Sequence, residues 1–264
     1  MKKSIVILDS GIGGLHILAA CKKLIPHGKF VYYADNLNAP YGNKTQKQLQ
    51  KIACKLVKKI IANHNPQIIV LACNTLTVNA IKFLRKRFPH QTFVGTEPAL
   101  KQARIYGGNT IILATPSTQK QFYFLNKKIT HELKKEHKNL DLPFFNDGKI
   151  FRVVVPNLAS RIEQNLNNLN RLQPQLNSIL CRTKFQTASN LVIGCTHYLA
   201  IKTQLQTALP EVKIFDNSLA IAKRVLQLLS SETTSPSAVP KFFCTANQKT
   251  YLIRIKKYFN KISN

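Results

Sequence analysis

Short apolar runs alternate with amphipathic stretches along the whole chain. The apolar runs hold mostly β-branched and aliphatic residues, which is typical of buried strands. They lie near residues 4–8, 29–33, 67–72, 92–95, 110–114, 150–155, 191–194, 212–215 and 241–244. Helical spacing follows most of them, as in residues 47–63, 78–87, 159–169 and 219–229. Strands that alternate with helices predict an α/β fold with mostly parallel sheets flanked by helices.

Similar strand-end motifs occur in the two halves of the chain. In the first half, strands end at Asp9-Ser10-Gly11 and at Cys73-Asn74-Thr75. In the second half, strands end at Thr115-Pro-Ser-Thr118 and at Cys195-Thr196-His197. We interpret this order as two similar α/β domains, each with a mostly parallel sheet, and with the active site in the cleft between them. Any doubly wound fold produces polar strand ends, so the repeat alone does not establish a duplication.

Turn-forming segments suggest where the domains meet. These segments lie at Glu97-Pro98, at Leu142-Pro143 and at Thr233–Pro240. We place the first domain at residues 1–97 plus 217–264, and the second at residues 98–216.

Two cysteines, Cys73 and Cys195, each end an apolar run and precede a stretch with helical spacing. Ligands of open α/β sheets bind outside the carboxyl ends of the strands. A helix N-terminus lowers the pKa of a thiol placed there, which makes the thiol a usable base or nucleophile. We interpret the pair as two thiols that act in one reaction from two sides. The alternative, two buried structural cysteines, is disfavoured because polar residues follow each of them.

The polar residues near these strand ends suggest anion binding. Asn74-Thr75 and Thr196-His197 offer hydroxyl, amide and backbone donors at helix N-termini, where carboxylates bind; N-capping is a compatible second role. Asp9 is either a cap or an acid near the thiols. The glycines that follow it do not form a dinucleotide fingerprint, because His16 stands where that motif needs glycine.

Other thiol chemistries fit the sequence poorly. A zinc site needs a second ligand pair besides Cys195-x-His197, and none has suitable spacing. A Cys-x5-Arg phosphatase loop is excluded because Asn79 and Ile201 occupy the required arginine positions. A papain-like site would leave one cysteine unexplained. The remaining cysteines we expect to be small buried hydrophobic residues, namely Cys21, Cys54, Cys181 and Cys244.

The formal net charge is +28, from 39 Lys and Arg against 11 Asp and Glu. Such a charge attracts polyanions, but the bases are dispersed and no nucleic-acid motif accompanies them. We interpret them as a solvated basic surface, with nucleic-acid binding as the alternative. No apolar run approaches the roughly 18 residues of a membrane span. The N-terminus is basic and then apolar, but its apolar part ends at Asp9, so we expect a first strand of a cytoplasmic protein rather than a signal peptide.

The motifs together resemble the glutamate racemase family, nearly from end to end. They are Asp9-Ser10-Gly11-Ile12-Gly13-Gly14, Pro40-Tyr41-Gly42, Ala72-Cys73-Asn74-Thr75, Glu97-Pro98-Ala99 and Gly194-Cys195-Thr196-His197-Tyr198. The resemblance implies a cofactor-independent isomerase without a metal, which interconverts L- and D-glutamate for peptidoglycan and cell-wall biogenesis. Family members are often dimers, which makes a homodimer an expected assembly.

The resemblance also implies roles for individual residues. Cys73 would deprotonate D-glutamate with help from Asp9, and Cys195 would deprotonate L-glutamate with help from His197. Asp35 and Glu163 match further acidic positions, and we include Glu163 among the catalytic residues. The substrate contacts implied are Asp9, Ser10, Tyr41, Gly42, Asn74, Thr75, Thr118, Thr196 and His197.

Some features depart from the family pattern. Asn38 replaces a common arginine, Leu199-Ala200 replaces Pro-Leu, and the stretch 129–149 is longer and more basic than usual. Because the chain starts almost directly at its first strand, we do not expect activation by a cell-wall precursor. Alternative functions are a racemase of aspartate or another amino acid, and a secondary role on nucleic acid or DNA gyrase.

Overall fold

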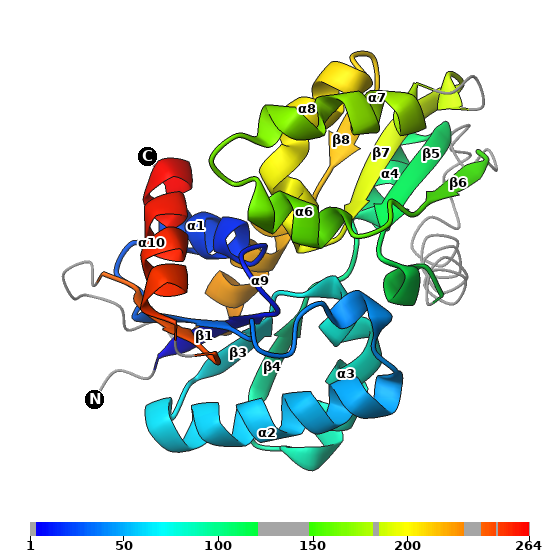
Figure 1. The fold of residues 1–264 in the computed structure, drawn as a ribbon. Coiled ribbons are helices and arrows are strands. Elements are labelled where there is room, and N and C mark those ends of the chain that lie inside the picture. Colours follow the sequence, from blue (N-terminus) through cyan, green and yellow to red (C-terminus); the bar gives the residue numbers. More distant parts are fainter. Residues whose placement is uncertain (1–3, 121–147, 182–184, 230–238, 247, 264) are drawn as a thin grey trace, which may run out of the picture. The chain divides into compact units, whose positions relative to one another are not determined.

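The computed structural model describes residues 4–120, 148–181, 185–229, 239–246 and 248–263. The chain divides into two compact units. Unit 1 holds Met1–Glu97 and Asn217–Asn264, and unit 2 holds Pro98–Asp216. Figure 1 shows the elements of each unit along the chain.

Unit 1 contains a five-stranded sheet in the order β4-β3-β1-β2-β9, in which every pair is parallel. Its strands are β1 (Ile5–Asp9), β2 (Phe30–Ala34), β3 (Ile68–Leu71), β4 (Thr92–Gly95) and β9 (Lys241–Cys244). Every residue of the three central strands is buried. This burial on both faces explains why their sequences are continuous apolar runs rather than alternating ones.

Helices cover both faces of this sheet (Figure 1). On one face, α2 (Gln46–His64) packs against α3 (Asn74–Arg87), and their apolar side chains join alternate residues of the strands in one core. On the other face, α1 (Leu15–Leu24) packs against α9 (Ser218–Leu228) and α10 (Lys249–Ser263). A short 3-10 helix, η1 (Tyr41–Asn43), precedes α2, whose start is fixed by a capping box of Thr45 and Gln48.

Unit 2 contains a four-stranded parallel sheet in the order β6-β5-β7-β8. Its strands are β5 (Asn109–Ala114), β6 (Ile150–Val153), β7 (Ala188–Gly194) and β8 (Lys213–Phe215). Its helices include α4 (Leu100–Tyr106), α6 (Leu158–Gln164), α7 (Gln173–Leu180) and α8 (Lys202–Ala208). Unit 2 also contains two 3-10 helices, η2 (Leu169–Leu172) and η4 (Thr196–Ile201), and a helical turn at residues 116–120 after β5.

The predicted α/β class and the parallel sheets are confirmed, and a strand lies at each predicted apolar run. The helix predicted at 159–169 is wrong in its second half, because α6 ends at Gln164. Asn165 caps it, and the amide of this residue donates to Arg161 O over 2.8 Å. Asparagine side chains compete in this way with helical backbone bonds, and three more asparagines follow before residue 171.

The prediction that the four remaining cysteines are buried is wrong for Cys181, which is exposed directly after the last residue of α7. Its thiol lies 3.2 Å from the Ala208 carbonyl oxygen. Cys54 and Cys244 are half-buried, and Cys21 is fully buried, which raises the pKa of its thiol to about 12.

Three predicted features lie wholly or largely outside the described residues: the Leu142-Pro143 segment, the long basic stretch 129–149 and the segment 233–240. Among the residues that are described, no helix combines the length and the apolar character needed to cross a bilayer.

Candidate active site

Cys73 lies where β3 gives way to α3, as the N-cap residue of that 14-residue helix. Its thiol is buried, and Ser10 Oγ donates a hydrogen bond to Cys73 Sγ over 3.7 Å. Strands β1 and β3 are parallel neighbours, so Ser10 and Cys73 follow the carboxyl ends of both at one sheet edge. The helix N-terminus carries a partial positive charge, which favours a thiolate at this position.

Asp9 ends β1 and is fully buried. Its Oδ1 accepts a hydrogen bond from the Gly11 N–H over 2.8 Å. This contact holds the polar turn after β1 and fixes the carboxylate. Gly14 allows the close approach of this turn to β3, because a Cβ there would lie 2.9 Å from the Cβ atoms of Asp9 and Ala72.

Tyr41 and Asp35 form a buried pair beside these groups. Tyr41 Oη donates to Asp35 Oδ2 over 2.5 Å, and both side chains are shielded from solvent. Burial raises the pKa of Tyr41 well above its ordinary value, and the charges of Asp35, Cys73 and Asp9 raise it further. Tyr41 therefore keeps its proton. Tyr41 and Cys73 also belong to one cluster of packed, buried residues.

The other predicted contacts of unit 1 lie in the same region. Asn74 and Thr75 are buried in the first turn of α3. The Asn74 amide donates to Thr96 O over 3.3 Å, which fixes its orientation. Gly42 is half-buried within η1, next to Tyr41.

Cys195 directly follows β7 and is buried. The expectation of an α-helix start here is wrong: the next six residues form the 3-10 helix η4, and α8 begins only at Lys202. Tyr198 N donates to Cys195 O over 3.0 Å, which closes the first 3-10 turn. A short 3-10 helix offers less dipole than a long α-helix, so other groups must support this thiol.

His197 is the main group that supports the Cys195 thiol. It makes a hydrogen bond to Cys195, and its Nε2 lies 3.0 Å from Glu163 Oε1 on α6. Burial by itself lowers the pKa of His197. The hydrogen bonds to Cys195 and Glu163 and the charges of both outweigh burial and hold that pKa well above its ordinary value. The arrangement is a thiol, an imidazolium and a carboxylate in series.

Thr196 is buried next to this chain of groups. Thr118 is also buried, in the first helical turn after β5, where its N–H donates to Thr115 Oγ1 over 3.3 Å. Because β5 and β7 are parallel neighbours, Thr118 and Cys195 both follow carboxyl ends at one edge of the unit 2 sheet.

Sequence reasoning missed two groups that belong to these surroundings. Tyr198 is buried, and both burial and the Cys195 charge raise the pKa of its hydroxyl well above the ordinary value. Thr245 donates to Asp35 Oδ1 over 2.6 Å from a position 210 residues away. Tyr198 could have been found as the residue that ends the Gly-Cys-Thr-His-Tyr motif, whereas no sequence signal marks Thr245.

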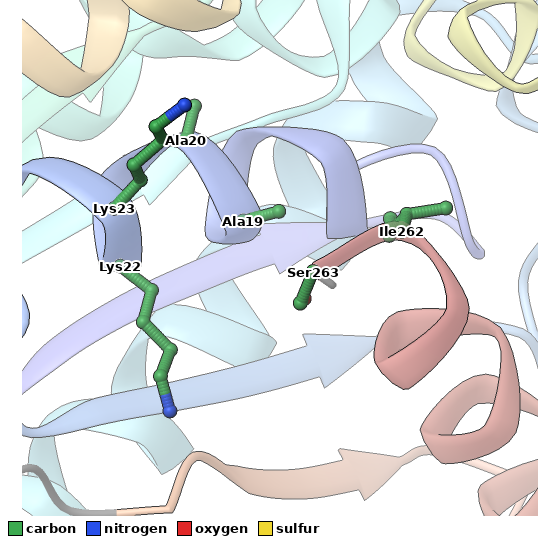
Figure 2. A pocket seen from close by; sticks show the side chains of 6 residues that line it. All are labelled: Ala19, Ala20, Lys22, Lys23, Ile262 and Ser263. Carbon is green, nitrogen blue, oxygen red and sulfur yellow. The ribbon is translucent and has the colours of Figure 1, made fainter.

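A surface hollow in unit 1 lies away from these residues. It has a volume of about 560 Å³ and is lined by Ala19, Ala20, Lys22, Lys23, Ile262 and Ser263. Figure 2 shows that the Lys22 and Lys23 side chains extend in different directions, so they do not converge on one ligand. In the described part of the chain, no three His, Cys, Asp or Glu side chains cluster in a way that could hold a metal ion.

Sequence comparison with known proteins identifies the family of this chain. No family model matches the chain. A glutamate racemase of Clostridium novyi is 30% identical over 263 residues, which cover 97% of this chain and 96% of that protein. A glutamate racemase of Bartonella henselae is 34% identical over 235 residues, with coverage of 86% and 82%. The chain belongs to the glutamate racemase family.

Solved glutamate racemase structures share the fold. The Escherichia coli glutamate racemase, in complex with L-glutamate and the activator UDP-MurNAc-ala, matches with a TM-score of 0.80 and 26% identity. The match covers 98% of this chain and 96% of that one. The Francisella tularensis glutamate racemase, in complex with D-glutamate, has the same fold with a TM-score of 0.74 and 22% identity.

Proposed function

We propose that this chain is a cofactor-independent glutamate racemase that supplies D-glutamate for peptidoglycan. The observation that carries the proposal is the pair of buried strand-end thiols, each with its own supporting groups: Ser10 at Cys73, and His197 with Glu163 at Cys195. Inversion at an α-carbon requires a proton to leave one face and another to arrive on the opposite face. Two bases of similar type meet that requirement.

In the proposed reaction, the Cys73 thiolate removes the α-proton of D-glutamate, and the electron pair passes into a planar carbanionic intermediate. The Cys195 thiol then donates its proton to the opposite face, which yields L-glutamate. Cys73 ends as a thiol and Cys195 as a thiolate, so the same steps run backwards from L-glutamate. No oxidation or reduction occurs, and one proton enters for each proton that leaves.

The groups around Cys195 suit a thiol that alternates between two charge states. His197 has a raised pKa and lies between Cys195 and Glu163. A protonated imidazole stabilises the Cys195 thiolate, and Glu163 in turn stabilises the imidazolium. This charge stabilisation suits a group that must take up and release a proton in the same reaction.

The carbanion needs stabilisation at the substrate's α-carboxylate. We propose that donors at the strand ends provide it, because positioned N–H and O–H groups stabilise developing negative charge. In unit 1 we propose as donors Asn74, Thr75 and the backbone N–H groups of Ser10, Tyr41 and Gly42, because the Ser10 and Tyr41 hydroxyls already donate to Cys73 and Asp35. Asp9 would receive the α-ammonium group. In unit 2 the donors are Thr118 and Thr196.

The test is incubation of the purified protein with L- or D-glutamate in D2O, without added cofactor. Racemisation accompanied by α-deuterium incorporation is expected from both enantiomers. Cys73→Ser and Cys195→Ser should each abolish racemisation. Cys181→Ser, which changes an exposed thiol on unit 2, is the matched control and should keep wild-type activity.

Aspartate, run alongside, tests the alternative substrate. The proposal requires glutamate to be the better substrate by kcat/KM. A preference for aspartate would keep the two-thiol chemistry and overturn the assignment of glutamate. Failure of both amino acids to racemise would overturn the reaction itself.

The proposal includes a cytoplasmic location and requires no nucleic-acid partner. The apolar residues 5–8 belong to the buried strand β1. The basic charge is spread widely: α1, α2, α3, α9 and α10 each carry lysine or arginine and no acidic residue. We expect the protein's affinity for DNA to fall steeply as salt rises, so that binding is weak at physiological salt. Tight DNA binding at physiological salt would establish a nucleic-acid role.

A further inference from the structure

Asp35 is a fully buried carboxylate that receives its hydrogen bonds from uncharged donors. Asn38 Nδ2 donates to Oδ1 over 2.9 Å and to Oδ2 over 3.0 Å. Tyr41 Oη donates to Oδ2 over 2.5 Å, and Thr245 Oγ1 donates to Oδ1 over 2.6 Å. Because a buried charge without its donors is costly, each of these neutral groups matters to the carboxylate's position.

Thr245 is itself held firmly at the end of β9. Its N–H donates to Ala34 O over 3.1 Å, which continues the parallel pairing of β2 with β9. Its Oγ1 accepts a hydrogen bond from the Leu37 N–H over 3.1 Å. Since this bond uses a lone pair of Thr245 Oγ1, the Thr245 hydroxyl proton is directed toward another acceptor. Asp35 Oδ1 is 2.6 Å away and Asn36 Oδ1 is 3.5 Å away, so the proton goes to Asp35.

The Asp35 side chain then fixes the Tyr41 hydroxyl. Burial and the Asp35 charge raise the pKa of Tyr41 well above its ordinary value, and Cys73 and Asp9 add to that shift. Tyr41 is therefore a neutral hydroxyl whose single proton is committed to Asp35. A hydroxyl in this state does not donate its proton to a Cys73 thiolate, so it does not quench that base.

We infer that Thr245 is a positioning residue for the Cys73 side of the reaction, acting through Asp35 on Tyr41. Its kinetic consequences rest on the proposed function, whereas the hydrogen-bond chain can be tested without it. If Thr245 lost its hydroxyl, Asp35 Oδ1 would lose the shorter of its two hydrogen bonds and keep only the one from Asn38, so the carboxylate could rotate away from Tyr41. The freed phenol proton could then be donated to Cys73, which weakens this thiolate as a base.

A double-mutant cycle separates this route from a general structural role. Thr245→Val removes the hydroxyl and keeps the side-chain shape; we expect kcat/KM for glutamate racemisation to fall about tenfold, as for loss of a hydrogen bond to a charged group. Thr245→Ser should restore most of the activity. In a Tyr41→Phe background, Thr245→Val should have no further effect. An equal fold loss in both backgrounds would overturn the inference.

The matched control is Thr207→Val, which removes a threonine hydroxyl that donates to Thr203 O over 3.1 Å on the exposed surface of α8. It should leave kcat/KM unchanged. Thermal melts of all variants check folding. If Thr245→Val does not fold, Thr245→Ala and Asp35→Asn replace it in the same cycle, with the same expected loss and the same lack of effect in Tyr41→Phe.

Proton NMR tests the chain of hydrogen bonds independently of activity. The Tyr41 hydroxyl proton, in a short bond to a carboxylate, should give a far-downfield resonance that disappears in Tyr41→Phe. Thr245→Val should displace or abolish this resonance, and Thr245→Ser should keep it. If the resonance is unchanged in Thr245→Val, the inference is overturned. If the resonance behaves as expected but the wild-type protein does not racemise glutamate, only the proposed function fails.

Discussion

On the Cys73 side, the thiol sits at the N-terminus of a long α-helix, close to two buried carboxylates and a tyrosine that keeps its proton. On the Cys195 side, the thiol lies just before a 3-10 helix and interacts with His197, which in turn is hydrogen-bonded to Glu163. The strand-end position is the same, but its electrostatic support differs. A helix dipole is fixed, whereas an imidazole changes charge with pH. The two thiols should therefore respond differently to pH and to mutation.

Apart from loss of either thiol, the largest expected effect comes from His197→Asn, which removes the imidazole that supports Cys195. General acid–base groups contribute about 100- to 10,000-fold, so kcat/KM for glutamate should fall at least about a hundredfold. Steady-state racemisation, followed by polarimetry, measures this. A loss of less than about threefold would show that Cys195 needs no imidazole and that the two sides are more alike than the geometry indicates.

A smaller, pH-dependent effect is expected from Glu163→Gln. The Glu163 bond and charge help raise the pKa of His197, so the variant should lower that pKa. The alkaline limb of the kcat/KM profile, which reports loss of the imidazolium proton, should move to lower pH. At pH values above this limb, kcat/KM of the variant should be about tenfold below that of the wild type. Histidine NMR titration locates the shift. An unchanged His197 pKa in the variant would contradict the role given to Glu163.

The same pair also links stability to pH. The folded pKa of His197 is raised above its unfolded value of about 6.5, so the folded state binds this proton more tightly. The stabilising contribution is fully present below about pH 6.5 and is lost as pH rises through the raised folded pKa. Denaturant unfolding of wild type and Glu163→Gln should show a difference that shrinks over this window. A difference that grows with pH would reverse the assigned sign.

The smallest effect on chemistry is expected from Gly14→Ala, which tests the packing of the Cys73 side. The new Cβ would lie 2.9 Å from the Cβ atoms of Asp9 and Ala72, so the turn after β1 must shift. Overpacking of this kind costs about 1–3 kcal/mol. Urea unfolding should show that loss, with activity reduced less than in His197→Asn. An equally stable variant would mean that the turn can move without disturbing Asp9.

The strands and the strand-end motifs were predictable because both sheets are parallel and their central strands are buried on both faces. Their strands are continuous apolar runs, and polar triplets stand out where they stop. Cys73 and Cys195 were visible for that reason. The end of α6 at Gln164 could not be predicted, because the helical spacing of apolar residues continues beyond it. Asparagine side chains after this point compete for the last carbonyl groups of α6.

Contacts between distant segments were the least predictable part. Thr245 contacts Asp35 because β9 pairs with β2. Local sequence does not determine the order of strands in a sheet. The 3-10 turn after Cys195 was also hidden, since Thr196–Ile201 carries the same apolar spacing that would start an α-helix. The His197–Glu163 contact needed α6 to lie against η4, which local pattern does not specify.

The central claim is that each thiol serves one enantiomer, Cys73 for D-glutamate and Cys195 for L-glutamate. The most direct test is α-deuterium incorporation in D2O by Cys73→Ser and Cys195→Ser, each with each pure enantiomer. We expect neither variant to racemise glutamate. Any remaining exchange should be confined to L-glutamate in Cys73→Ser and to D-glutamate in Cys195→Ser. Wild-type racemisation by either variant, or residual exchange of the opposite enantiomer, would contradict the account.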